Sequence, residues 1–223
     1  MTDTLDGESQ ARLSLATILP FSVVSLPLSA IGIAVFVYLP PYFASHLGVS
    51  MVTVGAVWGT VRLIDIPVDV ILALMMDRTR TRIGRYRPWL IGGAPILMAA
   101  LYFLFMAPRG VGAGYLVGGL LAMYLGASIV GLAHAAWSAT LATRYHERSR
   151  LFGVNTAVGV AGALGVLMIP ILGRQFGLGD VQGVQGMGWA IIALIPLTVG
   201  LAAIRTPERA TRNVRGPGFA LRD

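Results

Sequence analysis

Three ionisable residues, Arg62, Asp65 and Asp69, lie within one apolar stretch between residues 51 and 76. A helix of that length crosses a bilayer at about 1.5 Å per residue. A charged group near the bilayer centre costs at least roughly 2.5–3.5 kcal/mol, and such groups usually face a protein interior or a water-filled path. The chemistry that these residues suggest is therefore ion or substrate binding inside a membrane.

The spacing i, i+3 and i+7 places Arg62, Asp65 and Asp69 on one face of a helix. Two carboxylates one turn apart repel when both are ionised, and a bound Na⁺, a shared proton or a nearby arginine relieves that repulsion. We predict that Asp65 and Asp69 bind the coupling cation, and that they are metal ligands if the cation is Na⁺. We also predict that Arg62 is a substrate-binding residue. The alternatives for the three residues are direct substrate contact and a purely structural Arg62–Asp65 pair beside a solvated Asp69.

A second candidate pair is His134 and Trp137, which lie one helical turn apart in another apolar segment. A histidine is costly inside a membrane helix, so we predict that this pair binds substrate by hydrogen bonding and stacking. A structural hydrogen bond and simple packing are the alternatives. The three histidines have no metal-ligand spacing, cysteine is absent, and no nucleophile has an evident base. We therefore expect no enzyme activity and no cofactor besides the coupling ion.

Composition points to a membrane environment for all of these residues. The 223-residue chain is 56% hydrophobic and only 12% charged, whereas a soluble domain carries about 25% charged residues. Its mean hydropathy is +0.74, so we expect the lipid bilayer to be a partner. The net charge is +7, but the arginines lie between apolar segments rather than along one soluble face. We therefore expect no nucleic-acid partner.

The elements that position the candidate residues are six predicted transmembrane helices. Of the 17 basic residues, all arginine, 14 fall on one side of these segments, while Arg109 and Arg174 fall on the other. The positive-inside rule then predicts an inner (plasma) membrane protein with both termini cytoplasmic. Residues 1–204 form the predicted bundle, and residues 205–223 a cytoplasmic tail or the start of a linker. The predicted segments are Ile18–Ala44, Met51–Met76, Pro88–Ala107, Tyr115–Ala142, Leu151–Leu172 and Met187–Ile204.

The loop after the second segment, within residues 77–89, is positively charged. Its residue types also follow a particular order. An aspartate opens it, a glycine lies near its middle, and Pro-Trp begins the next helix, after two basic residues. With the helix-two charges and Glu147-Arg148 after segment four, the pattern resembles the glycoside–pentoside–hexuronide cation symporters of the major facilitator superfamily. The matching loop residues are Asp77, Thr79, Gly84, Arg85, Arg87, Pro88 and Trp89.

This resemblance implies an all-α membrane protein in which the chain supplies one six-helix half, built of two inverted three-helix repeats. The missing carboxy-terminal half, or a second copy, would complete the carrier. The implied function is cation-coupled symport of a small, sugar-like solute by alternating access, with a non-transporting scaffold or inactive half-carrier as the alternative. Charged sugar-site residues of the family fall on Ser29, Ala133 and near Thr156. The predicted inner gate comprises Asp77, Arg82, Arg85, Glu147 and Arg148.

Overall fold

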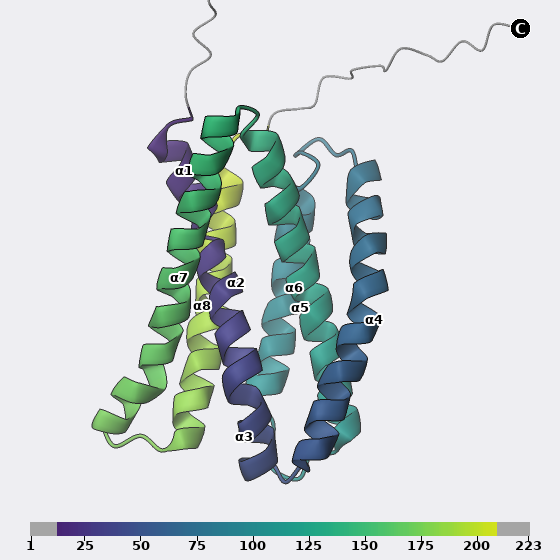
Figure 1. Ribbon diagram of the computed structural model, residues 1–223, viewed down its shortest axis with the longest axis vertical. Helices are drawn as coiled ribbons and strands as arrows, with labels where there is room; N and C mark the ends of the chain where they lie inside the picture. Colours follow the sequence, from purple (N-terminus) through teal and green to yellow (C-terminus); the bar gives the residue numbers. More distant parts are fainter. Residues whose placement is uncertain (1–12, 209–223) are drawn as a thin grey trace, which may run out of the picture.

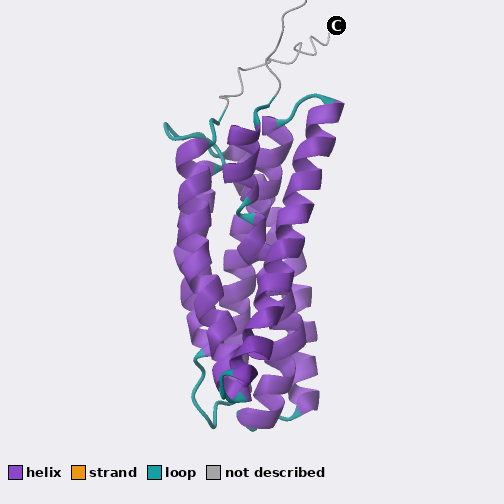
Figure 2. Cartoon of the chain, turned by 90° about the vertical axis from the view of Figure 1, so that its left-hand side faces the viewer, coloured by secondary structure: helices purple, strands orange, loops and turns teal. Residues whose placement is uncertain are grey.

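A computed structural model describes residues 13–208, and within that range the secondary structure is helical. The helices run side by side along one axis, with the connecting loops gathered at its two ends (Figures 1 and 2). Our predictions for the first 12 residues and for the tail beyond residue 208 lie outside the described residues. The helices are α1 (Leu15–Ser22), α2 (Ser25–Ile33), a π-helical segment (Ala34–Tyr38), α3 (Leu39–His46), α4 (Met51–Arg78), α5 (Arg87–Phe105), α6 (Ala113–Leu141), α7 (Tyr145–Gln175) and α8 (Asp180–Arg205).

The first predicted segment is a single helical path from Leu15 to His46, interrupted by a turn at Val23 and Val24. Its π-helical part, Ala34–Tyr38, directly precedes α3. Pro40 cannot donate a backbone hydrogen bond into the preceding turn, which explains why the helix widens there. Prolines therefore bend this segment without ending it.

Five helical stretches are long and apolar enough to cross a membrane: Leu15–His46, α5, α6, α7 and α8. The second predicted segment, Met51–Met76, forms α4, which at 28 residues is about 42 Å long. Helix α4 is not among the five, and it contains Arg62, Asp65 and Asp69. The described bundle is therefore consistent with a major facilitator half, while six spans and the inverted repeats stay predictions.

Helices α7 and α8 begin earlier than their apolar segments. Helix α7 starts at Tyr145 rather than Leu151, and α8 starts at Asp180 rather than Met187. Both added stretches are polar, and each opens its helix with an acidic residue in the first turn, where the helix dipole favours negative charge. Hydropathy locates the apolar part of a membrane helix and misses such polar turns.

The bundle has an arginine-rich end, which we define by the loops 79–86 and 142–144 and by residues 206–208. The loops 47–50, 106–112 and 176–179 form the opposite end. The chain enters and leaves the described bundle at the arginine-rich end (Figure 1). That placement agrees with the predicted topology, and the side of the membrane on which this end lies stays a prediction.

Close helix packing depends on particular glycines. A Cβ at Gly162 of α7 would lie 2.7 Å from the Cα of Leu26 in α2, and one at Gly126 of α6 would lie 2.7 Å from the backbone nitrogen of Leu97 in α5. Gly159 also approaches α2, whereas Gly153 and Gly165 face open space. Of these four glycines of α7, only Gly159 and Gly162 therefore make a close contact with α2.

Candidate functional site

The charged face of α4 contains an ion pair directed toward α6. Arg62 Nη1 lies 2.7 Å from Asp65 Oδ2, and Ser128 of α6 donates a hydrogen bond of 3.2 Å to Asp65 Oδ1. The Asp65 side chain is 2% exposed, whereas that of Arg62 is 59% exposed. Both oxygens of the buried carboxylate therefore have partners, one of them cationic.

Asp69 lies one turn further along α4 and is half-buried. Its Oδ1 is out of contact with solvent and has no hydrogen-bond partner among the described residues. Buried polar groups in folded proteins almost always have partners, so an unpaired carboxylate oxygen invites an explanation such as an unseen water or ion. Of the two predicted cation ligands, Asp69 is thus the one with an acceptor oxygen that has no described partner.

An aromatic residue of α6 adjoins the same ion pair. The guanidinium of Arg62 lies over the ring of Tyr124, 5.8 Å from its centroid. The Tyr124 ring also meets Phe36 edge-on, with centroids 6.4 Å apart, and its hydroxyl is buried without a partner within the described chain. Tyr124 of α6 therefore contacts Arg62, and Phe36 of the π-helical segment packs against Tyr124.

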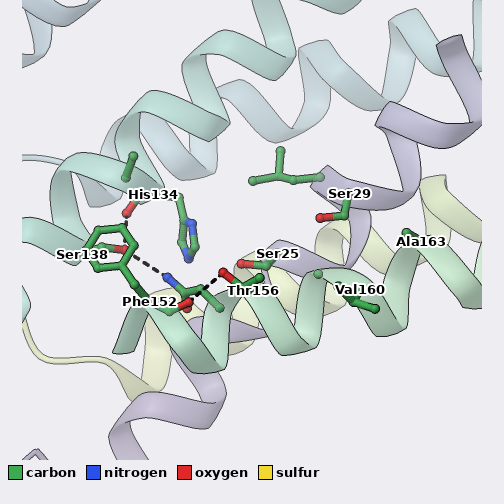
Figure 3. Close-up of a pocket in the computed structure, with 12 residues that line it drawn as sticks. Ser25, Ser29, His134, Ser138, Phe152, Thr156, Val160 and Ala163 are labelled. Atoms are coloured by element: carbon green, nitrogen blue, oxygen red, sulfur yellow. Dashed lines mark hydrogen bonds between the residues drawn. The ribbon is translucent and has the colours of Figure 1, made fainter. Parts of the chain in front are cut away.

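A separate cavity of about 450 Å³ lies between α2, α6 and α7 (Figure 3). His134 Nε2 lies 3.2 Å from the carbonyl oxygen of Phe21, and the two rings stack with centroids 4.4 Å apart. Because a carbonyl only accepts, Nε2 carries the proton, and Nδ1 of a neutral ring is then an acceptor. The lining side chains are uncharged: Ser25, Leu28, Ser29, His134, Ala135, Ser138, Phe152, Asn155, Thr156, Gly159, Val160 and Ala163.

Two further polar side chains of the cavity form a short chain of hydrogen bonds. Ser138 donates to the carbonyl oxygen of His134 at 2.9 Å, and Asn155 Nδ2 donates to Ser138 Oγ at 3.3 Å. Asn155 Oδ1 is buried with no partner among the described residues. The cavity wall therefore offers an acceptor, His134 Nδ1, while Asn155 Oδ1 lies below the surface without solvent contact.

The structure separates residues that we grouped as substrate-binding. His134 lines the cavity, whereas Arg62 contacts Asp65 and Tyr124. Trp137 is fully buried, with its ring edge-on to Phe21 and covered by the guanidinium of Arg87, 5.6 Å from its centroid. The described contacts of Trp137 are thus those of a packing residue beside the cavity.

The positions at which the family resemblance placed sugar-reading charges also lie in this region. Ser29 and Thr156 line the cavity, and Ala133 is fully buried next to His134. Ser29 and Thr156 therefore place neutral hydroxyls in this part of the cavity wall.

The predicted gate residues divide into two groups at the arginine-rich end. Arg85 Nη2 lies 2.6 Å from Asp77 Oδ1, and the same side chain donates to the carbonyl oxygens of Met76 and Asp77. On α7, Glu147 accepts a 3.3 Å hydrogen bond from the Leu13 amide, and Arg148 lies over the ring of Phe152. Arg82 is exposed. The structure thus pairs Asp77 with Arg85 and leaves Glu147 and Arg148 in a different set of contacts.

Two residues of the site were missed by sequence reasoning, Ser128 and Tyr124. Each is an isolated polar or aromatic residue of an apolar segment, and Ser128 is 63 positions from Asp65. Helical periodicity relates residues within one helix only, so nothing in the sequence pairs α6 with the charged face of α4.

A bundle of membrane-length helices that carries a buried carboxylate and an open cavity without charged lining residues is typical of a multi-pass membrane protein. The chain belongs to the MFS/sugar transport protein family, whose pattern matches residues 20–218. This assignment confirms the family resemblance. Proteins of this family are transporters rather than enzymes, which also agrees with the absence of an enzyme motif.

Relatives of the chain include proteins named as symporters. It is 25% identical over 83% of its length to the uncharacterized symporter YnaJ of Bacillus subtilis, and 28% identical over 88% to the uncharacterized symporter sll1374 of Synechocystis. It is 26% identical over 73% to a lactose permease of Lactobacillus delbrueckii. The matched regions cover 40%, 38% and 27% of these relatives, respectively. The chain therefore spans well under half the length of each of them.

Proposed function

We propose that the chain is the amino-terminal six-helix half of a cation-coupled symporter, and that Asp65 and Asp69 bind the coupling Na⁺ or H⁺. The observation that carries this proposal is the buried, unpartnered Oδ1 of Asp69 one turn from the buried Asp65 carboxylate. A cation there would supply the missing partner, with Ser128 as a neighbouring oxygen ligand. Hard carboxylate and hydroxyl oxygens suit Na⁺, and a carboxylate also accepts a proton.

In this mechanism Arg62 is the internal counter-ion of Asp65. A ligand shifts a conformational equilibrium only through different affinities for the two states. A cation bound between the carboxylates neutralises part of the negative charge beside Arg62 on α4. The empty and the loaded carrier therefore differ in their preference for the two conformations. The carrier then alternates access by rocking against a second half, supplied by the remainder of a longer protein or by a second copy.

The proposed solute site is the cavity between α2, α6 and α7. Ser29 and Thr156 line it with neutral hydroxyls at positions where the family resemblance placed charges, and His134 Nδ1 offers an acceptor. A ligand that fits these groups is uncharged and donates hydrogen bonds, as the hydroxyls of a neutral sugar do. The name of the relative from Lactobacillus, lactose permease, is in keeping with a sugar-like solute.

Uptake into proteoliposomes that contain the product of the intact gene tests coupling and solute class together. Na⁺ and H⁺ gradients are imposed separately, and neutral glycosides are compared with the glucuronides that differ from them by one carboxylate. We expect one of the two gradients to drive uptake of a neutral glycoside. Uptake indifferent to both gradients contradicts coupling, and a preference for glucuronides contradicts the neutral-solute assignment.

His134→Gln is expected to raise the KM for the solute roughly three- to tenfold, because one neutral hydrogen bond contributes about 0.5–1.5 kcal/mol. The glutamine amide can replace the donor to the Phe21 carbonyl, but it offers no equivalent of Nδ1. The matched control is His46→Gln, since His46 lies at the opposite end of the bundle and bonds Ser45. Equal KM values in the two variants would remove His134 from the solute site.

A further inference from the structure

Glu208 is an acidic residue just beyond the end of α8, outside the predicted gate. Its Oε1 accepts hydrogen bonds from the backbone amides of Arg85 at 2.5 Å and Tyr86 at 2.8 Å, and its Oε2 accepts one from Arg87 at 3.3 Å. These amides lie at the start of α5, where a helix has donors without internal partners. A carboxylate that follows α8 therefore caps a helix that begins more than 120 residues earlier.

The loop before α5 is shaped to receive this carboxylate. Gly84 has φ +123°, a conformation that side chains rarely adopt. A Cβ on Gly84 would collide with the Glu208 carboxylate. A second contact joins the start of α5 to the residues after α8: Arg87 Nη2 donates a hydrogen bond of 2.8 Å to the carbonyl oxygen of Thr206. The end of α8 is thus held against the loop by an acceptor side chain and by a backbone carbonyl.

The same loop is held at its other end by Arg85. The Arg85 side chain donates to the carbonyl oxygens of Met76 and Asp77, the last turn of α4, and pairs with the Asp77 carboxylate. A cation therefore lies at the carboxyl end of α4 and an anion at the amino end of α5, which is the favourable arrangement for both helix dipoles. Burial raises the pKa of the neighbouring Tyr86 phenol, which stays neutral between these charges.

We propose that Glu208 is a positioning residue of the gate: its carboxylate fixes the backbone of Arg85, and through Arg85 it joins the end of α8 to the end of α4. This inference rests on the proposed transport function. The segment from α4 to α5 and the end of α8 then move as one unit while the carboxylate is seated, and the Asp77–Arg85 pair can rearrange only when Glu208 leaves the three amides.

Hydrogen–deuterium exchange on the purified chain in lipid nanodiscs tests this linkage without any transport. Glu208→Ala is expected to speed exchange of the Arg85, Tyr86 and Arg87 amides about tenfold or more, because hydrogen bonds to a charged group are lost. Exchange of the Thr79 amide, which bonds the Met76 carbonyl at 3.2 Å, is expected to rise with them. Glu208→Asp restores part of the protection and Glu208→Gln gives an intermediate rate.

Asp180→Asn is the matched control, since Asp180 forms an exposed ion pair with Arg174 at the opposite end. It is expected to leave all four amides unchanged. Gly84→Ala is expected to reproduce the Glu208→Ala pattern by displacing the carboxylate, and the double variant is expected to exchange no faster than either single variant.

Three results would overturn the inference. The first is unchanged exchange at residues 85–87 in Glu208→Ala, or in Glu208→Gln if the alanine variant does not fold. The second is faster exchange at those amides while the Thr79 amide exchanges at its original rate. That result would mean that Glu208 only caps α5 and does not join it to α4. The third is additive acceleration in the double variant. Because none of these readouts uses transport, a failure of the symport proposal would be separately visible.

Discussion

Asp69→Asn is expected to shift cation-stimulated uptake to much higher cation concentrations while the protein folds normally. The Asp69 Oδ1 has no partner among the described residues, so the substitution breaks no described hydrogen bond of that atom. It does remove one of two charges from the proposed cation site. Losing an ionic ligand costs about 1.5–3 kcal/mol, which corresponds to a roughly 10- to 100-fold weaker affinity for the coupling ion. Uptake measured against a graded cation gradient would report this shift.

The companion variant Asp65→Asn is expected to affect packing as well as coupling. Asp65 has partners in both Arg62 and Ser128, so its replacement is expected to impair coupling and stability together. Asp180→Asn, in an exposed ion pair, should affect neither. If Asp69→Asn retained normal coupled uptake, the two carboxylates would serve helix packing only. The symport proposal would then lose its main support.

Gly162→Ala is expected to destabilise the bundle by about 1–3 kcal/mol or more, since overpacking a close contact costs that much even when side chains can adjust. The added methyl would lie 2.7 Å from the Cα and 2.8 Å from the carbonyl carbon of Leu26. Backbone atoms cannot turn away, so α2 and α7 must separate. Unfolding of the purified protein by a denaturing detergent, followed by circular dichroism, would measure the loss.

Gly165→Ala is the control for this substitution, because a methyl at Gly165 meets no atom within 4 Å. Alanine favours a helix by about 1 kcal/mol relative to glycine, so the control is expected to be neutral or slightly stabilising. Equal unfolding midpoints for the two variants would show that α2 and α7 do not pack as closely as the structure places them.

The membrane class, the helices and the charged face of α4 were all predictable from local information. Apolar runs of membrane length produce helices because a backbone in lipid must satisfy its own hydrogen bonds. Pro88 marks the start of α5 because proline is suited to the first turn of a helix. Helix ends were less predictable, since the polar first turns of α7 and α8 carry no hydropathy signal.

Partners across the bundle were not predictable in the same way. Arg62 and Asp65 could be paired by their spacing alone, but Ser128 and Tyr124 reach that pair only because α6 packs on α4. The predicted grouping of His134 with Trp137 followed helical periodicity correctly, and yet only His134 lines the cavity. Which side of a helix faces a cavity depends on the neighbouring helices.

By itself the sequence determined that this chain forms membrane-length helices and that ionisable groups share one face of one helix, because hydropathy and helical period act over neighbouring residues. Only the tertiary structure decided that Asp69 has a vacant oxygen, that His134 meets Phe21, and that Glu208 reaches the amides before α5. These contacts join residues far apart in the chain. They depend on how whole helices pack, and close backbone contacts such as that of Gly162 with Leu26 determine this packing.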